Sequence, residues 1–239
     1  MNRLPRPGDD RGVVGGTRAD GPYADAMSLF DAFVPAARPV VRLVADRGLH
    51  GDGELGHEFA YGRLLAPGLR QVIVMVRKGA VSGPIDPVDL GGWAACSTRG
   101  VDGLHHLRSP QHSTLDAPGA RVHTFVSQDV FGASRLLVLD ELLAEHLHLE
   151  RPSHGTLVIA PNRHLLAVHV LESIAAVPAA LELLGELALV EHRIADPVSP
   201  WVYYRSPAGR LSLLTSFEGD GRLHADFEAA LRRLADIAR

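Results

Sequence analysis

The sequence predicts an α+β fold in which antiparallel hairpins pack against amphipathic helices, preceded by a disordered N-terminal tail. Two pairs of apolar runs are separated by gaps of hairpin size, 156–160 with 164–170 and 201–205 with 211–217. Other segments of the second half repeat their apolar residues with the spacing of a helix face. These two patterns together indicate paired strands covered by helices.

The first 26 residues form the predicted tail, since they combine Gly, Pro, Arg and Asp with no periodic apolar pattern. A denser apolar stretch begins at Met27, which is also a candidate initiator. The remaining residues, 27–239, are long enough to bury a core, as one domain or as two lobes over 27–126 and 127–239.

The clearest element of the first half is a strand over 71–76. This run is β-branched and almost wholly apolar, so both of its faces should be buried. Pro67 and Gly68 are expected to end a short helix over 58–65. The other expected elements are a strand or helix end at 40–44, a Gly-rich loop over 47–56, a turn-rich stretch over 79–120 with a short helix near 87–95, and a strand over 121–126.

The helices of the second half are predicted from apolar stripes and from end signals. Asp140 is the expected N-cap of a helix that runs through Leu149. A helix over 177–192 carries one core-facing stripe, made of Val177, Leu181, Leu184 and Ala188. The last helix, 223–238, carries another, made of Leu223, Phe227, Leu231, Leu234 and Ile237, with Glu228 and Arg232 able to pair opposite it.

Net charge and the use of cysteine and lysine limit the class of protein. Lys and Arg number 24 and Asp and Glu number 28, a formal net charge of −4, so the chain lacks the basic field of nucleic-acid-binding proteins. Cys96 is the single cysteine, which excludes an intramolecular disulfide and fits a reducing cytoplasm. Lys78 is the single lysine, and basic residues that are otherwise Arg indicate a bacterial genome of high GC content.

No segment of the sequence reads as a membrane or secretion signal. Residues 1–20 contain no apolar core of a signal peptide, and charged residues and a proline interrupt the longest apolar stretch, 165–190. We therefore expect a cytoplasmic protein with no membrane partner.

Three sequence motifs of known chemistry are incomplete. Gly51–Gly56 matches G-x-G-x-x-G but carries two acidic residues and stands apart from the preceding apolar run, so nucleotide binding there is a lesser alternative. His57-Glu58 begins a zinc motif that ends in Tyr61 instead of histidine. Ser134 occupies the serine position of a partial nucleophile-elbow motif, G-x-S-x-G, in which Leu136 stands where the second glycine is required. We interpret Ser134 as a turn or cap residue.

Cysteine and histidine give no preorganised site on a single element. Cys96 has no His or Arg among the three residues before it, and Arg99 follows it, so a structural thiol is the default interpretation. The paired histidines point apart at their spacings, as His146 and His148 do on a helix and His164 and His169 on a strand. We expect no metal and no cofactor, and a histidine site assembled from separate elements stays open as an alternative.

A binding surface is predicted from two distinctive stretches. Asn162 and Arg163 occupy a turn between two strands, and Trp201, Tyr203 and Arg205 follow one another along a later strand. Aromatic residues beside arginine are typical of binding surfaces, although aromatics are also ordinary strand formers.

Two short motifs link the chain to a known family. The first runs from Ala133-Ser134-Arg135-Leu136-Leu137 through an acidic helix to Leu157–Arg163, and the second is Asp89-Leu90-Gly91-Gly92-Trp93. Over about residues 65–170 the chain resembles the YtpQ-like bacterial proteins, although the insert at 99–120 departs from them. That family is functionally uncharacterised, so the resemblance implies no activity or site residue.

Taken together, these features predict a non-catalytic protein that acts through a surface for a protein partner or a small ligand. The alternative from another class is a hydrolase with a discontinuous site built from Ser134 or from clustered histidines, whose side chains would have to converge on a carboxylate in one pocket.

Overall fold

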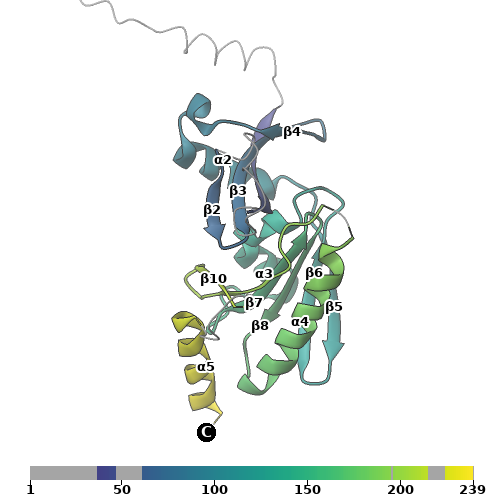
Figure 1. The fold of residues 1–239 in the computed structure, drawn as a ribbon, viewed down its shortest axis with the longest axis vertical. Coiled ribbons are helices and arrows are strands. Elements are labelled where there is room, and N and C mark those ends of the chain that lie inside the picture. The colour runs from purple at the N-terminus through teal and green to yellow at the C-terminus, as the bar shows by residue number, and fades with distance from the viewer. Residues whose placement is uncertain (1–36, 47–60, 195, 215–223, 239) are drawn as a thin grey trace, which may run out of the picture. The chain divides into compact units, whose positions relative to one another are not determined.

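The computed structural model describes residues 37–46, 61–194, 196–214 and 224–238, all within one compact unit, Ala37–Arg239. Two antiparallel sheets and several helices make up this unit (Figure 1), and this confirms the predicted α+β class. The predicted domain start at residue 27, and the predicted tail before it, lie outside the described residues.

A four-stranded sheet is built around β3 (Leu69–Arg77). β1 (Arg38–Ala45) pairs along one side of β3, while β2 (Arg63–Ala66) and β4 (Ala80–Pro84) share its other side. Alternate β3 side chains enter two different apolar clusters. Val72 and Val74 belong to one cluster, and Ile73 belongs to the other. The expectation that this strand is buried on both faces is therefore confirmed.

The expected helix over 58–65 is wrong where the structure describes it. Residues 63–66 form strand β2, which pairs with β3 through a two-residue connection made of Pro67 and Gly68. Gly68 has φ +82°, and proline followed by a glycine of positive φ is typical of a type II turn. The two residues therefore close a hairpin, where the sequence suggested that they end a helix.

A six-stranded sheet follows in the order β10-β9-β7-β8-β6-β5. Its strands are β5 (Gln111–Ala117), β6 (Ala120–Val126), β7 (Thr156–Asn162), β8 (Leu165–Val170), β9 (Val202–Arg205) and β10 (Leu211–Leu213). Both predicted hairpins are present, β7 with β8 and β9 with β10. β5 and β6, which precede residue 127, lie in the same sheet as the later strands.

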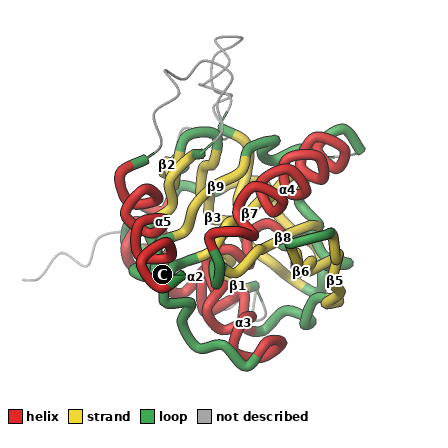
Figure 2. Tube along the Cα trace, turned by 90° about the horizontal axis from the view of Figure 1, so that it is seen from below, coloured by secondary structure: helices red, strands yellow, loops and turns green. Residues whose placement is uncertain are grey.

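Side chains of this sheet alternate between two apolar clusters on opposite faces. Leu157 and Ile159 pack with α4 (Val177–His192) and with α5 (Ala225–Ile237), whereas Val158 packs with α3 (Leu139–Leu147). Figures 1 and 2 show α4 running across the strands. Helices thus cover both faces, which explains why β7 is buried throughout its length.

The two long helices at the C-terminal end follow their predicted bounds closely. α4 spans the predicted residues 177–192, and its buried stripe is Val177, Ala180, Leu184 and Ala188. In α5, Phe227 and Leu234 are buried, and Glu228 pairs with Arg232 at 3.3 Å as predicted. Ile237 was expected in the core but is 71% exposed. The last turn of α5 therefore extends beyond the apolar cluster.

The predicted turn-rich stretch 79–120 contains strand β4, a 3-10 helix over Pro87–Leu90, the helix α2 (Trp93–His105) and strand β5. The turn glycines Gly91, Gly92 and Gly119 have positive φ, whereas two glycines inside α2 serve helix packing. A Cβ atom at Gly103 would lie 2.5 Å from the Pro39 carbonyl oxygen, and one at Gly100 would lie 2.7 Å from Val41. Glycine lets α2 approach β1 this closely, at the cost of a weaker local helix signal.

The helix predicted from Asp140 begins slightly earlier. α3 starts at Leu139 with Val138 at the capping position, so Asp140 is a first-turn residue and not the cap. Its carboxylate instead receives two hydrogen bonds from Arg205, at 2.8 and 2.9 Å. Within the described ranges, no helix combines the length and the apolar character that crossing a membrane requires.

Candidate functional site

The five residues of the predicted binding surface do not gather at one place. In the register of β7 and β9, Arg205 lies opposite Thr156, whereas Asn162 is at the other end of β7. At roughly 3.4 Å per residue, the ends of β7 are about 20 Å apart. The surface therefore separates into an Asn162–Arg163 part and an Arg205 part.

Asn162 is buried and holds the β7–β8 turn together. Its Oδ1 accepts hydrogen bonds from the backbone N–H groups of His164 and Leu165, at 2.9 and 3.1 Å. Its Nδ2 donates to the Glu191 carboxylate at 3.1 Å, which ties the turn to the end of α4. All of these contacts are internal, so Asn162 positions its neighbour Arg163 rather than meeting a ligand itself.

Tyr203 is fully buried and bridges the two sheets. Its hydroxyl donates to the Pro67 carbonyl oxygen at 2.8 Å and lies 2.7 Å from Ser199 Oγ. Burial raises the pKa of this phenol well above its usual value. Trp201 is half-buried beside Gly68 and packs against the same core. The structure thus places both aromatic residues in packing roles.

Arg205 is also engaged, through a bidentate pair with Asp140. Fork-to-fork geometry of this kind is the strongest arrangement of an arginine and a carboxylate. Arg205 borders a small cavity of about 100 Å³ walled by leucines, which leaves little space for a ligand.

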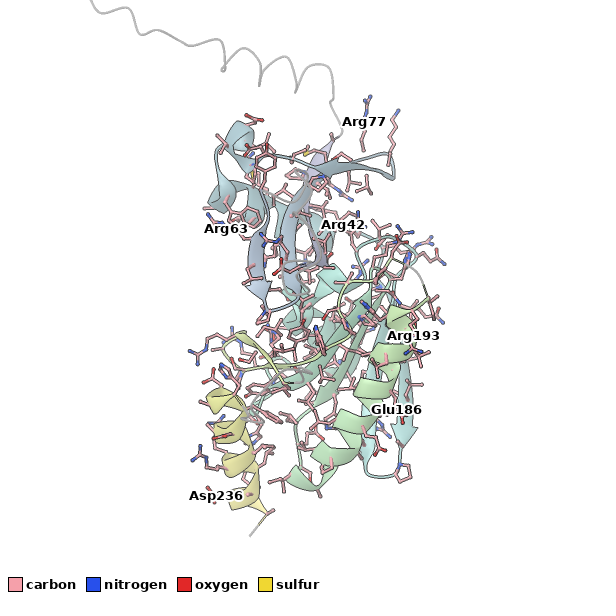
Figure 3. All side chains as sticks on the ribbon, viewed as in Figure 1. Arg42, Arg63, Arg77, Glu186, Arg193 and Asp236 are labelled. Atoms are coloured by element: carbon pink, nitrogen blue, oxygen red, sulfur yellow. The ribbon has the colours of Figure 1, made fainter. Side chains whose placement is uncertain are left out.

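Arg163 is the predicted residue that borders a larger space. A cleft of about 390 Å³ is lined by residues 42–46 of β1 and its end, by Arg163, by His192 at the end of α4, and by 196–198 with Pro200. We call it the Arg42 cleft. Figure 3 shows Arg42 where the four-stranded sheet meets the turn end of β7 and β8. Its walls come from segments more than 100 residues apart in the chain.

Arg42 is the unusual residue of this cleft. Its Nε atom is buried without a hydrogen-bond partner, and no described residue forms a hydrogen bond or ion pair with its guanidinium. Burial lowers the pKa of Arg42, the nearby Arg163 charge lowers it further, and Asp196 partly offsets both effects. A buried donor without an acceptor is rare in native proteins and calls for an explanation.

The other charged residues of the cleft are paired. Arg163 donates from Nη2 to Asp196 at 2.9 Å and from Nε to His164 Nε2 at 2.9 Å. Asp46 accepts from both Nε and Nη2 of Arg70, at 3.2 and 3.1 Å. The backbone of Asp196 has φ +47°, an uncommon conformation that Asp tolerates better than most residues. Among the described arginines and carboxylates that line the cleft, Arg42 is therefore the one that forms no hydrogen bond or ion pair.

Ser134 and Cys96, the two nucleophile candidates, are occupied by structural contacts. Ser134 is fully buried, and its Oγ accepts a 2.9 Å hydrogen bond from the Leu43 N–H, which closes the outer edge of β1. Cys96 is buried with Sγ 3.6 Å from the Leu90 carbonyl oxygen, and burial raises the pKa of its thiol. Both side chains are buried, and the raised pKa of the Cys96 thiol is the opposite of what an activated nucleophile requires.

Three histidines from separate elements do come together, as the sequence left open. His112 of β5 and His123 of β6 share a hydrogen bond of 3.2 Å, and the ring of His146 from α3 lies 5.3 Å from that of His112. Even so, no group of three or more His, Cys, Asp or Glu side chains in the described part of the chain could hold a metal ion.

Sequence reasoning missed Arg42, although a signal was present. A charged residue interrupts the run Val40-Val41-Arg42-Leu43-Val44, and a charge inside a buried strand needs a partner or a role. The Gly51–Gly56 loop and the His57-Glu58 pair lie outside the described residues. Comparisons with protein-family models, with curated proteins and with solved structures gave no match.

Proposed function

We propose that this protein binds a small ligand in the Arg42 cleft and does not transform it. The observation that carries the proposal is the half-buried Arg42 guanidinium, which lines the cleft and whose buried Nε donor has no hydrogen-bond partner among the described residues. A buried donor without an acceptor calls for an explanation, and a ligand in the cleft would supply the missing acceptor. A volume of about 390 Å³ falls in the range of small-molecule sites.

The composition of the cleft supports binding without catalysis. Among the described residues that line it there is no Ser, Thr, Cys or Lys, and the two carboxylates, Asp46 and Asp196, are held by arginines. His192 donates from Nδ1 to the Pro161 carbonyl oxygen at 3.1 Å. A positioned nucleophile with an adjacent base, the usual requirement for group transfer, is not assembled from these side chains.

The wider setting follows from the sequence. We also propose that the protein works in the cytoplasm of a high-GC bacterium and is related to the YtpQ-like family. A single cysteine and a nearly lysine-free composition support the first proposal, and the motifs around Ser134 and Asn162 support the second. A protein partner that inserts a side chain into the cleft would use the same chemistry.

A fragment screen by NMR tests the location of the site. The full chain, labelled with ¹⁵N, is titrated with a library of small organic acids, amines and neutral heterocycles. We expect bound fragments to change the chemical shifts of the protein amides mainly at residues 42–46, at His192 and at Val198. Pro197→Trp places a large side chain in the Arg42 cleft. The matched control Ala117→Trp does the same in a second cleft of about 340 Å³. Fragments that still bind Pro197→Trp, or that are lost only in Ala117→Trp, would contradict the proposal.

A further inference from the structure

We infer that the ligand of the Arg42 cleft is a small monocarboxylate with an apolar body, an assignment that rests on the proposed binding function. Three observations point to this class: an unpaired guanidinium, a balance of charges that leaves one positive charge, and apolar walls around it.

The anchoring group is Arg42. A guanidinium presents several N–H donors in a planar fork and matches a carboxylate at two points. With Nε buried and no partner from the described residues, a carboxylate in the cleft would supply the missing acceptor. Arg163 lies near enough for its charge to lower the pKa of Arg42, so an anion between them would also relieve the repulsion of two like charges.

The number of charges favours one negative charge on the ligand. Asp196 pairs with Arg163 and Asp46 pairs with Arg70, so each of these arginines already faces a carboxylate. Among the described residues that line the cleft, only Arg42 carries a charge without an ion-pair partner. A phosphate monoester carries close to two negative charges at neutral pH and would leave one of them beside Asp46 and Asp196.

The walls of the cleft favour an apolar body. Leu43, Val44, Pro197, Val198 and Pro200 supply hydrocarbon surface beside the charged end. Binding sites for small molecules typically combine such walls with a few polar groups that fix orientation. A ligand with a carboxylate at one end and a short hydrocarbon chain behind it meets both requirements, whereas acetate would use only the charged end.

Calorimetric titration of the full chain separates these contributions. The probes are hexanoate, hexanol, acetate and hexyl phosphate, which vary the charge and the hydrocarbon independently. We expect hexanoate to bind about 10-fold or more tightly than hexanol, as loss of a charge-assisted hydrogen bond implies. Acetate should also bind about 10-fold or more weakly than hexanoate, because it lacks the buried methylenes. Hexyl phosphate should bind more weakly than hexanoate.

Matched variants assign the effect to one arginine. Arg42→Gln should lower the affinity for hexanoate by about 10-fold or more and leave hexanol unaffected. Arg77→Gln is the control, since Arg77 is exposed at the β3–β4 turn (Figure 3), and it should change affinity less than about 2-fold. If Arg42→Gln fails to fold, the comparison of hexanoate with hexanol on the natural chain still decides the question.

Several results would overturn the inference. Equal affinities for hexanol and hexanoate would show that the cleft does not recognise a carboxylate. Tighter binding of hexyl phosphate than of hexanoate would show that the ligand does not carry a single negative charge. An amidated pentapeptide ending in leucine is compared with its free acid. Binding of the free acid about 10-fold tighter than hexanoate would assign the cleft to a chain terminus instead of a small molecule. Failure of all these anions, with neutral fragments still bound at residues 42–46, would leave the proposed function standing without this ligand class.

Discussion

Two arginines, Arg135 and Arg42, show the difference between a charge that builds the fold and one that the fold leaves available. Burial lowers the pKa of both guanidiniums. Arg135 donates to Ser127 Oγ at 2.9 Å, to the Arg108 carbonyl oxygen and to the Asp129 carboxylate at 2.9 Å. Arg42 has no such partner within the described residues.

The difference teaches that burial of a charge does not by itself indicate function. A buried ion that is fully hydrogen-bonded is a structural element, and its removal exposes the cost of the partners left behind. A half-buried ion with an unsatisfied buried donor, such as Arg42 with its Nε atom, has already met part of its desolvation cost, so it can bind an incoming acceptor with less further loss of hydration. The two residues therefore predict opposite consequences of mutation.

The largest effect is expected from removing Arg135. Arg135→Ala removes the hydrogen bonds that this buried guanidinium donates to Ser127 Oγ, to the Arg108 carbonyl oxygen and to Asp129, and should lower the free energy of unfolding by about 3 kcal/mol. Urea unfolding followed by circular dichroism measures the change. Arg77→Ala, a truncation of an exposed arginine, should stay within about 0.5 kcal/mol. A loss below about 1 kcal/mol in Arg135→Ala would show that its partners are satisfied some other way.

A smaller effect is expected from acid, because of a third kind of buried group. The ring of His112 stacks on His123 and lies tilted against His146, whose Nε2 is buried without a hydrogen bond, 3.8 Å from the Glu145 carboxylate. Burial lowers the pKa of His123 to about 4, helped by the charges of His112, Arg121 and His169 and opposed by Asp116. Burial also lowers the pKa of His112, with a contribution from His146.

The sign of the pH dependence follows from these depressed pKa values. As the pH falls from 6.5 to about 4, the unfolded chain gains a proton at His123 while the native protein does not. The contribution of His123 to the free energy of unfolding is therefore fully present above pH 6.5 and is lost as the pH falls through this window. We expect a loss of about 1–2 kcal/mol, since the ring is partly screened by solvent. Urea unfolding at several pH values measures it, and His123→Phe should flatten the profile. An equally steep profile in that variant would place the effect elsewhere.

Local pattern predicted most of the fold, and it failed where tertiary contacts decide the local structure. The stripe of α4 and the hairpin of β7 with β8 were predictable because their signals lie within neighbouring residues. The α2 helix was not predictable from its own residues. Its Gly100 and Gly103 allow the close approach of β1, which lies more than 50 residues away in the sequence.

The candidate site shows the same limit. Arg163 was predictable as a turn residue between two strands, but its partner in the cleft was not. Arg42 and Arg163 are 121 positions apart, and only the packing of the two sheets brings them together. The aromatic stretch, by contrast, is chemically distinctive in sequence and turns out to pack in the interior, with Tyr203 fully buried.

The smallest stability effect, and the sharpest test of the comparison, comes from Arg42→Met. Methionine keeps much of the length of the side chain and removes a guanidinium that forms no hydrogen bond or ion pair with a described residue, so the free energy of unfolding should rise by about 1 kcal/mol. The same substitution should abolish the preference for hexanoate over hexanol. Arg77→Met should change neither quantity. A gain in stability coupled to a loss of binding is expected only if Arg42 is retained for a ligand. If Arg42→Met instead destabilises the protein as Arg135→Ala does, the two arginines belong to one structural class and the cleft loses its anchoring group.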